Sequence, residues 1–146
     1  MHFYVINGPN LNFLGIREPH IYGHTTLEML QDDLQEFAEE QGFKVSFFQS
    51  NVEGEIINCL QTCHHQHIDG IVINPAAFTH YSYAIADALK SISVNAVEVH
   101  ISNIYKREEF RQHSVTASSC VGVISGLGMD GYKLALLHLL KSVEKS

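Results

Sequence analysis

The stretch GIVINPAAFTHYSYAIADALKSISVNAVEVHI, residues 70–101, decides the fold class. It opens with the nearly unbroken apolar run Gly70–Pro75, which is typical of a strand covered on both faces. A helical pattern follows at Tyr81–Ile92, with Ala84, Ile85, Ala88 and Leu89 facing inward, and a second strand follows at Asn95–Ile101. Two strands joined by a helix predict parallel pairing through a right-handed crossover.

Strands and helices are expected to alternate in the same way over the rest of the chain. Further strands are predicted at His2–Asn7, Lys44–Ser50 and Val121–Ser125, and further helices from a capping box at Thr25-Thr26-Leu27-Glu28 to near Gly42, from about Glu53 to His67, and from Tyr132 to about Val143. This order predicts a single α/β domain over residues 1–146, with a flavodoxin-like, doubly wound, five-stranded parallel sheet and helices on both faces. The leucine-rich last helix is apolar nearly all round, which predicts a second buried face against another subunit.

The composition limits the function classes. A net charge of −7 argues against a general nucleic-acid or anionic-membrane binder, because such proteins need a basic face. The first ten residues show no basic segment followed by an apolar one, and three cysteines are an odd number. We therefore expect a cytoplasmic protein with reduced thiols and with neither a nucleic-acid nor a membrane partner.

A long connection separates the first strand from the first long helix. It covers residues 8–24, GPNLNFLGIREPHIYGH, and glycines 8, 15 and 23 divide it. Loops of this length without structure of their own are uncommon in compact domains and are usually lids or binding loops. We interpret this segment as an active-site lid.

Side chains able to bind a ligand gather after the predicted strands, where open parallel sheets bind their ligands. They are Asn7, Asn10, Asn12, Arg17 and Tyr22 after the first strand, Gln49, Ser50 and Asn51 after the second, Asn74, Thr79 and His80 after the third, and His100, Ser102, Asn103, Arg107 and Arg111 after the fourth. Loops are polar in any case, but amides and imidazoles in place of lysines and carboxylates favour a binding site. The chain has only three arginines, Arg17, Arg107 and Arg111. They are either ordinary surface residues or one local anion site.

Two pairs of residues could carry acid–base chemistry. Glu98 and His100 are two apart on a strand and share a face, so the carboxylate could fix the tautomer of the imidazole and leave its other nitrogen for acid catalysis. The alternative is a chance pair on a half-exposed strand. Arg17 could stabilise a Tyr22 phenolate able to remove a proton from carbon. The alternative is a packing or stacking pair.

Two other motifs favour structural interpretations. Residues 126–131, GLGMDG, match a dinucleotide fingerprint, but no strand and no acidic residue follow at the required distance. We interpret them as a tight turn whose amide groups face the site. Cys59, Cys63 and His67 share one helix face, but the outer pair lie about 12 Å apart and cannot meet at one zinc ion. We expect no metal site.

Five segments together resemble one family, type II 3-dehydroquinate dehydratase. They are NGPNLNFLGIREPHIYG, QSNVEGEII, INPAAFTHYS, VEVHISNIYKREEFRQHS and GVISGLGMDGY, in family order over nearly the whole chain. The resemblance implies loss of water from 3-dehydroquinate to give 3-dehydroshikimate, in the shikimate pathway, by anti elimination through an enolate and without metal or organic cofactor. It also implies a homo-oligomer, a dodecamer assembled from trimers.

The resemblance assigns a role to each matching residue. It makes Tyr22 the base, with Arg17 beside it, and His100 the acid, oriented by Glu98. Asn10 would hold the enolate, directly or through water. The remaining substrate contacts would come from the side chains of Asn74, His80 and Arg111, from the amides of Ile101 and Ser102, and from Asp87 of a neighbouring subunit.

The chain departs mildly from the family pattern. Ala76 stands where many relatives have glycine, and Tyr81 and Tyr83 flank Ser82 where smaller residues are frequent. These changes could alter the shape of the pocket or the subunit contacts. The rival functions are a nucleotide- or flavin-binding module, which the bulky turn at Pro9 disfavours, a signalling receiver domain, which would need acidic residues at positions 7 and 74, and an inactive scaffold.

Overall fold

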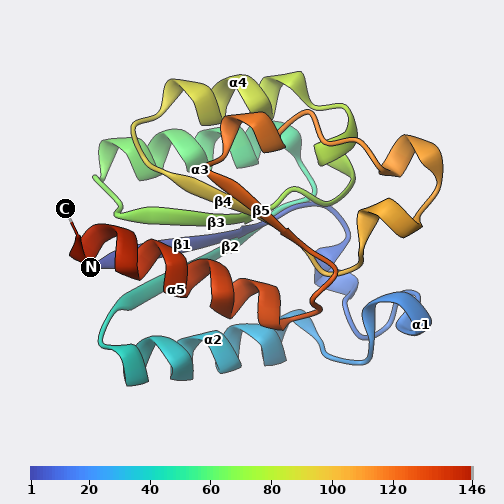
Figure 1. Ribbon diagram of the computed structural model, residues 1–146, viewed down its shortest axis with the longest axis horizontal. Coiled ribbons are helices and arrows are strands. Elements are labelled where there is room, and N and C mark those ends of the chain that lie inside the picture. The colour runs from blue at the N-terminus through green and yellow to red at the C-terminus, as the bar shows by residue number, and fades with distance from the viewer. Residues whose placement is uncertain (146) are drawn as a thin grey trace.

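The computed structural model describes residues 1–145 and places five strands side by side in one parallel sheet (Figure 1). The strands are β1 (His2–Asn7), β2 (Lys44–Gln49), β3 (Gly70–Asn74), β4 (Ala96–His100) and β5 (Gly122–Ser125). The α-helices are α1 (Pro19–Tyr22), α2 (Leu27–Gln41), α3 (Glu53–His65), α4 (Tyr83–Ser91) and α5 (Asp130–Glu144). Short 3-10 turns are η1 (Leu11–Phe13), η2 (Ala76–His80), η3 (Ile104–Lys106), η4 (Glu109–Arg111) and η5 (Ala117–Ser119).

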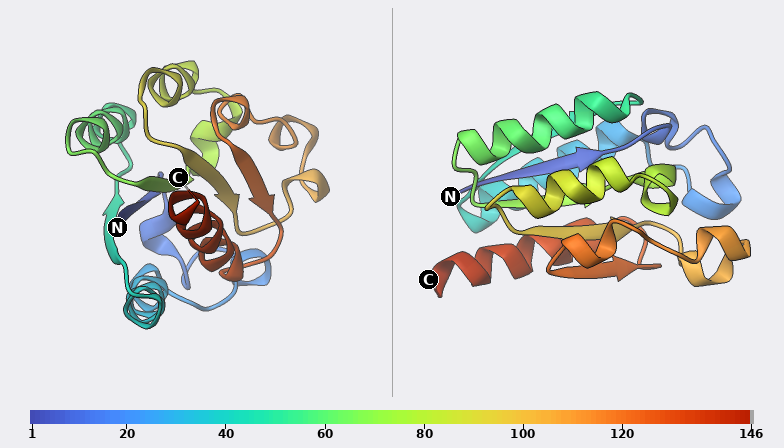
Figure 2. Two further views of the ribbon diagram at one scale, coloured as in Figure 1. Left: turned by 60° about the vertical axis from the view of Figure 1, so that its left-hand side comes forward. Right: turned by 90° about the horizontal axis from the view of Figure 1, so that it is seen from above.

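The strand order is β2-β1-β3-β4-β5, so the direction of winding reverses between β1 and β3. Asn7 at the end of β1 is in register with both Gln49 of β2 and Asn74 of β3. Helices α3 and α4 cover one face of the sheet, and α2 and α5 cover the other (Figures 1 and 2). The predicted flavodoxin-like fold is confirmed. Its reversal point is where this architecture binds ligands.

Local capping sets the ends of the helices. The Thr26 side chain accepts a hydrogen bond from the Met29 amide (3.1 Å), so the cap of α2 lies one residue after the start of the predicted box. Gly42 ends α2 in a left-handed conformation (φ 80°), as expected. Ser82 caps α4 in the same way as Thr26 caps α2, by accepting from the Ile85 amide (3.0 Å). Helix α4 therefore begins at Tyr83, two residues later than predicted.

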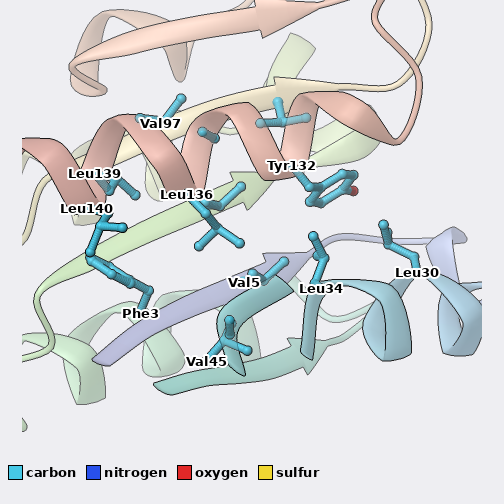
Figure 3. Close-up of a cluster of buried hydrophobic side chains, with 14 of the residues drawn as sticks. Phe3, Val5, Leu30, Leu34, Val45, Val97, Tyr132, Leu136, Leu139 and Leu140 are labelled. Carbon is cyan, nitrogen blue, oxygen red and sulfur yellow. The ribbon is translucent and has the colours of Figure 1, made fainter. Parts of the chain in front are cut away.

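Each face of the sheet has its own hydrophobic core. Leu30 and Leu34 of α2 meet Leu136 and Leu139 of α5 over one face (Figure 3). Ile56, Leu60 and other side chains of α3 pack with α4 over the other face. On α5, Leu134 stays 44% exposed, so the predicted second apolar face of this helix is not covered within the chain. None of the helices among residues 1–145 is both long and apolar enough to cross a membrane.

The long connection over residues 8–24, which the sequence led us to interpret as a lid, has structure of its own. It contains η1 and α1, and Leu11 and Leu14 anchor it in the core. Gly15 adopts φ 87°, and a Cβ there would lie 2.8 Å from the His24 carbonyl oxygen. Tyr22 at the end of α1 is therefore presented by a short helix that lies beyond the carboxyl ends of the strands (Figure 1).

Candidate active site

A pocket lies beyond the carboxyl ends of β1, β3 and β4, at the reversal point of the sheet. Nine of the predicted site residues line it: Asn10, Arg17, Tyr22, Asn74, His80, His100, Ile101, Ser102 and Arg111. Glu98 lies behind His100, within the protein. Asp87 is exposed on α4 and does not line this pocket. The structure thus brings together all the predicted site residues except Asp87.

Glu98 and His100 form a buried pair on β4. Nε2 of His100 lies 2.8 Å from Oε2 of Glu98, so the prediction that they lie side by side is confirmed. Ser114 also donates to Oε2 (2.8 Å), and Thr116 donates to Oε1. Burial alone would raise the pKa of Glu98, but the hydrogen bonds from His100, Thr116 and Ser114 outweigh it and hold that pKa below its ordinary value. The carboxylate is therefore ionised at neutral pH.

This pairing decides which nitrogen of His100 can meet a ligand. An ionised carboxylate only accepts, so Nε2 carries a proton toward Glu98. Nδ1 is then the ring nitrogen left for the pocket that His100 lines. Because both residues are almost fully buried, the ring has little freedom to turn. The site holds one imidazole nitrogen in a fixed position.

Tyr22 contacts two guanidinium groups. Nη1 of Arg107 donates to the Tyr22 oxygen (2.9 Å) and approaches Oγ of Ser102 (3.3 Å). The guanidinium carbon of Arg17 lies 5.3 Å from the centre of the Tyr22 ring. Arg17 was expected to sit beside Tyr22 and does so. The hydrogen bond to the phenol oxygen, however, comes from Arg107, which the predicted set of site residues omitted.

The contact with Tyr22 also acts on the pKa of Arg107. Burial lowers the pKa of its guanidinium, but the hydrogen bond and the attraction to Tyr22 outweigh this and raise the pKa above its ordinary value. Arg111, held by Glu108 at 2.6 Å, lines the same pocket as Arg17 and Arg107. The three arginines therefore form the local positive site that the sequence left open. Their scarcity was the signal that could have found Arg107.

His80 contributes a neutral imidazole. Its Nδ1 lies 2.8 Å from the carbonyl oxygen of His113, which can only accept, so the proton is on Nδ1. Burial lowers the pKa of His80, and the nearby Arg111 and His100 add to this effect. Nε2 is then a hydrogen-bond acceptor at neutral pH.

The turn between β5 and α5 does not face the site in the way predicted. The amide of Gly126 donates to the His100 carbonyl (3.1 Å), and that of Gly128 donates to the Ile101 carbonyl (3.0 Å). Both amides donate to backbone carbonyls at the end of β4 and are not free to bind a ligand, so the prediction that they face the site was wrong. The N–H groups of Ile101 and Ser102 have no acceptor within residues 1–145, and both residues line the pocket. They are the backbone donors of the site.

The departures from the family pattern have structural counterparts. Ala76 lines the pocket with φ 53°, a left-handed conformation that glycine adopts more easily. Tyr81 and Tyr83 are 58% and 71% exposed and do not line the pocket, so they do not shape it within one chain. Cys59 and Cys63 are buried in the core, and no group of three residues among positions 1–145 could hold a metal ion.

Comparisons with known proteins agree with this architecture. The family model described as dehydroquinase class II matches residues 1–140. The chain is 54% identical to the 3-dehydroquinate dehydratase of Carboxydothermus hydrogenoformans over 99% of its own length and 94% of the relative, and 58% identical to that of Bacillus pumilus over 95% and 94%.

Solved structures show the same likeness. The type II dehydroquinase of Butyrivibrio crossotus superposes with a TM-score of 0.94 at 52% identity, covering 95% of this chain and 97% of that one. A 3-dehydroquinate dehydratase-like protein from Bifidobacterium longum gives a TM-score of 0.70 at 33% identity, covering 97% and 98%. The chain therefore belongs to the class II dehydroquinase family.

Proposed function

We propose that this chain removes water from 3-dehydroquinate to give 3-dehydroshikimate, a step of the shikimate pathway. One observation carries the proposal: Tyr22 and His100 line a single pocket, the first backed by guanidinium groups and the second by a buried carboxylate. A base and an acid of these kinds are what elimination of water from a hydroxyketone requires.

In the first step, Tyr22 acts as a phenolate and takes the proton from the carbon beside the ketone. The electron pair of that C–H bond moves onto the ketone oxygen and forms an enolate. Arg107 stabilises the phenolate through its hydrogen bond, and Arg17 adds positive charge near the ring. Asn10 helps to hold the enolate oxygen, directly or through water.

In the second step, the enolate re-forms the ketone and pushes the electron pair into a new carbon–carbon double bond. The C–O bond to the hydroxyl breaks, and His100, which enters this step with a proton on each ring nitrogen, gives the Nδ1 proton to the departing oxygen, which leaves as water, while the Nε2 proton stays bonded to Glu98. Glu98 stabilises the orientation of the ring. The base and the acid act on opposite faces of the substrate, an anti elimination.

The remaining pocket residues hold the substrate. We assign the substrate carboxylate to the N–H groups of Ile101 and Ser102, and its hydroxyls to Asn74, His80 and Arg111. No lysine lines the pocket among the described residues, and the mechanism uses no Schiff base, metal or organic cofactor. The ketone itself makes the adjacent C–H acidic enough for a positioned base.

A direct assay tests this function. Purified protein mixed with 3-dehydroquinate should produce the ultraviolet absorbance of the conjugated product. Absence of that signal at high concentration of folded protein would contradict the proposal.

We further propose that the chain acts in the cytoplasm as a dodecamer assembled from trimers, in which Asp87 reaches the pocket of a neighbouring subunit. The exposed Leu134, Tyr81 and Tyr83 are apolar or aromatic side chains suited to such contacts. Light scattering behind size-exclusion chromatography should give twelve times the mass of the chain. A fully active monomer at assay concentration would contradict both the dodecamer and the role of Asp87 in a neighbouring pocket.

A further inference from the structure

Tyr132 is a fully buried tyrosine on α5 whose hydroxyl reaches two strands of the sheet. It donates a hydrogen bond to Oδ1 of Asn7 at the end of β1 (2.6 Å) and accepts one from Nδ2 of Asn74 at the end of β3 (2.9 Å). Figure 3 shows its ring projecting from α5 into the core beside Leu30 and Leu34. The mechanism above gives this hydroxyl no role, yet it touches a residue of the pocket.

The hydrogen bonds around Tyr132 can run in only one direction. The Ala76 amide, which can only donate, binds Oδ1 of Asn74 (3.1 Å), so Nδ2 of Asn74 must face Tyr132. Burial raises the pKa of Tyr132 well above its ordinary value, so the phenol keeps its single hydrogen at neutral pH. That hydrogen goes to Asn7, and the hydroxyl is left as an acceptor for Asn74.

The arrangement is costly for the fold. Nδ2 of Asn7 is buried and has no acceptor within residues 1–145. A buried donor without a partner destabilises the folded state, and apolar side chains of similar shape would avoid the cost. A polar group retained in a core at such a cost points to a role other than stability.

We propose that Tyr132 is a positioning residue that fixes the Asn74 amide toward the hydroxyls of the substrate. Both ends of that amide are held, Oδ1 by the Ala76 amide and Nδ2 by Tyr132, so the second hydrogen of Nδ2 has a fixed direction. Helix α5, which contributes no side chain to the pocket lining, thereby sets the affinity for substrate. This inference rests on the proposed function, in which Asn74 binds a substrate hydroxyl.

A double-mutant cycle tests whether Tyr132 acts through Asn74. Tyr132→Phe should raise KM for 3-dehydroquinate about tenfold while kcat stays within about threefold. Asn74→Ala should raise KM at least as much, and Tyr132→Phe should add no further increase in the Asn74→Ala background. An unchanged KM in Tyr132→Phe, or the same tenfold increase in both backgrounds, would overturn the inference.

Two further variants separate positioning from loss of stability. Leu139→Ala, two turns farther along α5 in the same core, should lower Tm and leave KM unchanged. Asn7→Leu combined with Tyr132→Phe also removes the buried Asn7 amide and should regain part of the stability that Tyr132→Phe loses, while KM stays high. A KM that returns to normal together with Tm would overturn the inference. Inactive wild-type protein would instead contradict the proposed function, and with it this inference.

Discussion

The two halves of the candidate site are built in different ways. His100 and Glu98 stand on β4, are 5% and 0% exposed, and are held by a buried network with Thr116 and Ser114. Tyr22 stands on α1, a four-residue helix without any buried residue, inside the long connection between β1 and α2. The acid half is thus fixed by the sheet, whereas the base half depends on the conformation of a surface segment.

Arg107 connects the base half of the site to the segment that follows β4. Arg107 bonds the phenol of Tyr22 across 85 positions of sequence, so it ties the segment over residues 8–24 to the end of β4. A segment with few buried contacts needs such a tie to keep its shape. The same guanidinium group supplies positive charge beside the oxygen proposed as the base. We infer that the hydrogen bond between Arg107 and Tyr22 both holds the segment over residues 8–24 in place and activates the base.

The largest expected effect comes from removing the base. Tyr22→Phe should lower kcat about 10⁴-fold with little change in KM, because proton removal is lost while the binding groups remain. Steady-state kinetics with 3-dehydroquinate would measure this. Tyr105→Phe, at a tyrosine 67% exposed on η3, serves as the control and should leave kcat unchanged. Near-normal turnover in Tyr22→Phe would remove Tyr22 from the role of base.

Removal of the acid should have a smaller effect. His100→Ala should lower kcat about 10³-fold, because water in the pocket can partly replace the imidazole as a proton donor. His138→Ala, at an exposed histidine of α5, is the matched control. An effect on KM alone would contradict the assignment of His100.

The hydrogen bond between Arg107 and Tyr22 can be weakened while the positive charge at position 107 is kept. Arg107→Lys should lower kcat about 30-fold, since an ammonium group cannot reach the Tyr22 oxygen and Ser102 with the geometry of a guanidinium group. Arg17→Lys should cost less, about threefold, because Arg17 lies over the ring and does not bond the oxygen. The reverse order of the two effects would show that Arg17 is the main partner of the base.

The smallest effect concerns the stability of the acid half. The pKa of Glu98 is below its ordinary value of 4.5, so its ionised form stabilises the fold above that pH, and the contribution is lost as pH falls through the lowered pKa. Thr116→Val removes one donor to Glu98 and should cost about 1–2 kcal/mol at pH 7. Thermal unfolding should show this difference shrinking below pH 4.5.

Thr62→Val, on the exposed side of α3, is the control for Thr116→Val. Its difference in stability from the wild-type protein should not depend on pH. A stability difference for Thr116→Val that stays constant from pH 7 to pH 3 would mean that Thr116 does not act through the charge of Glu98.

Much of the fold could be predicted from local patterns. The apolar runs predict β1 and β3 because parallel strands covered on both faces have few polar positions. Thr26 and Gly42 mark the ends of α2, since capping depends on neighbouring residues only. The Glu98–His100 pair could also be predicted from the sequence, because residues two apart on one strand point to the same face of the sheet.

The contacts that were missed join distant segments. Arg107 and Tyr22 meet only after the segment over residues 8–24 folds back, which no periodicity encodes. The amides of Gly126 and Gly128 pair with carbonyls at the end of β4, so their direction depends on how two loops pack. The proposed role of Asp87 depends on a second chain. Arrangements of this kind follow from packing between elements.

The central claim is that Tyr22 removes the proton and His100 completes the elimination, and hydrogen exchange separates the two steps. Substrate deuterated beside the ketone is incubated in ordinary water with each variant, and loss of deuterium from unreacted substrate is followed by mass spectrometry. His100→Ala should still exchange the deuterium while forming little product, and Tyr22→Phe should do neither. Exchange by Tyr22→Phe at the rate of the wild-type protein would contradict the account.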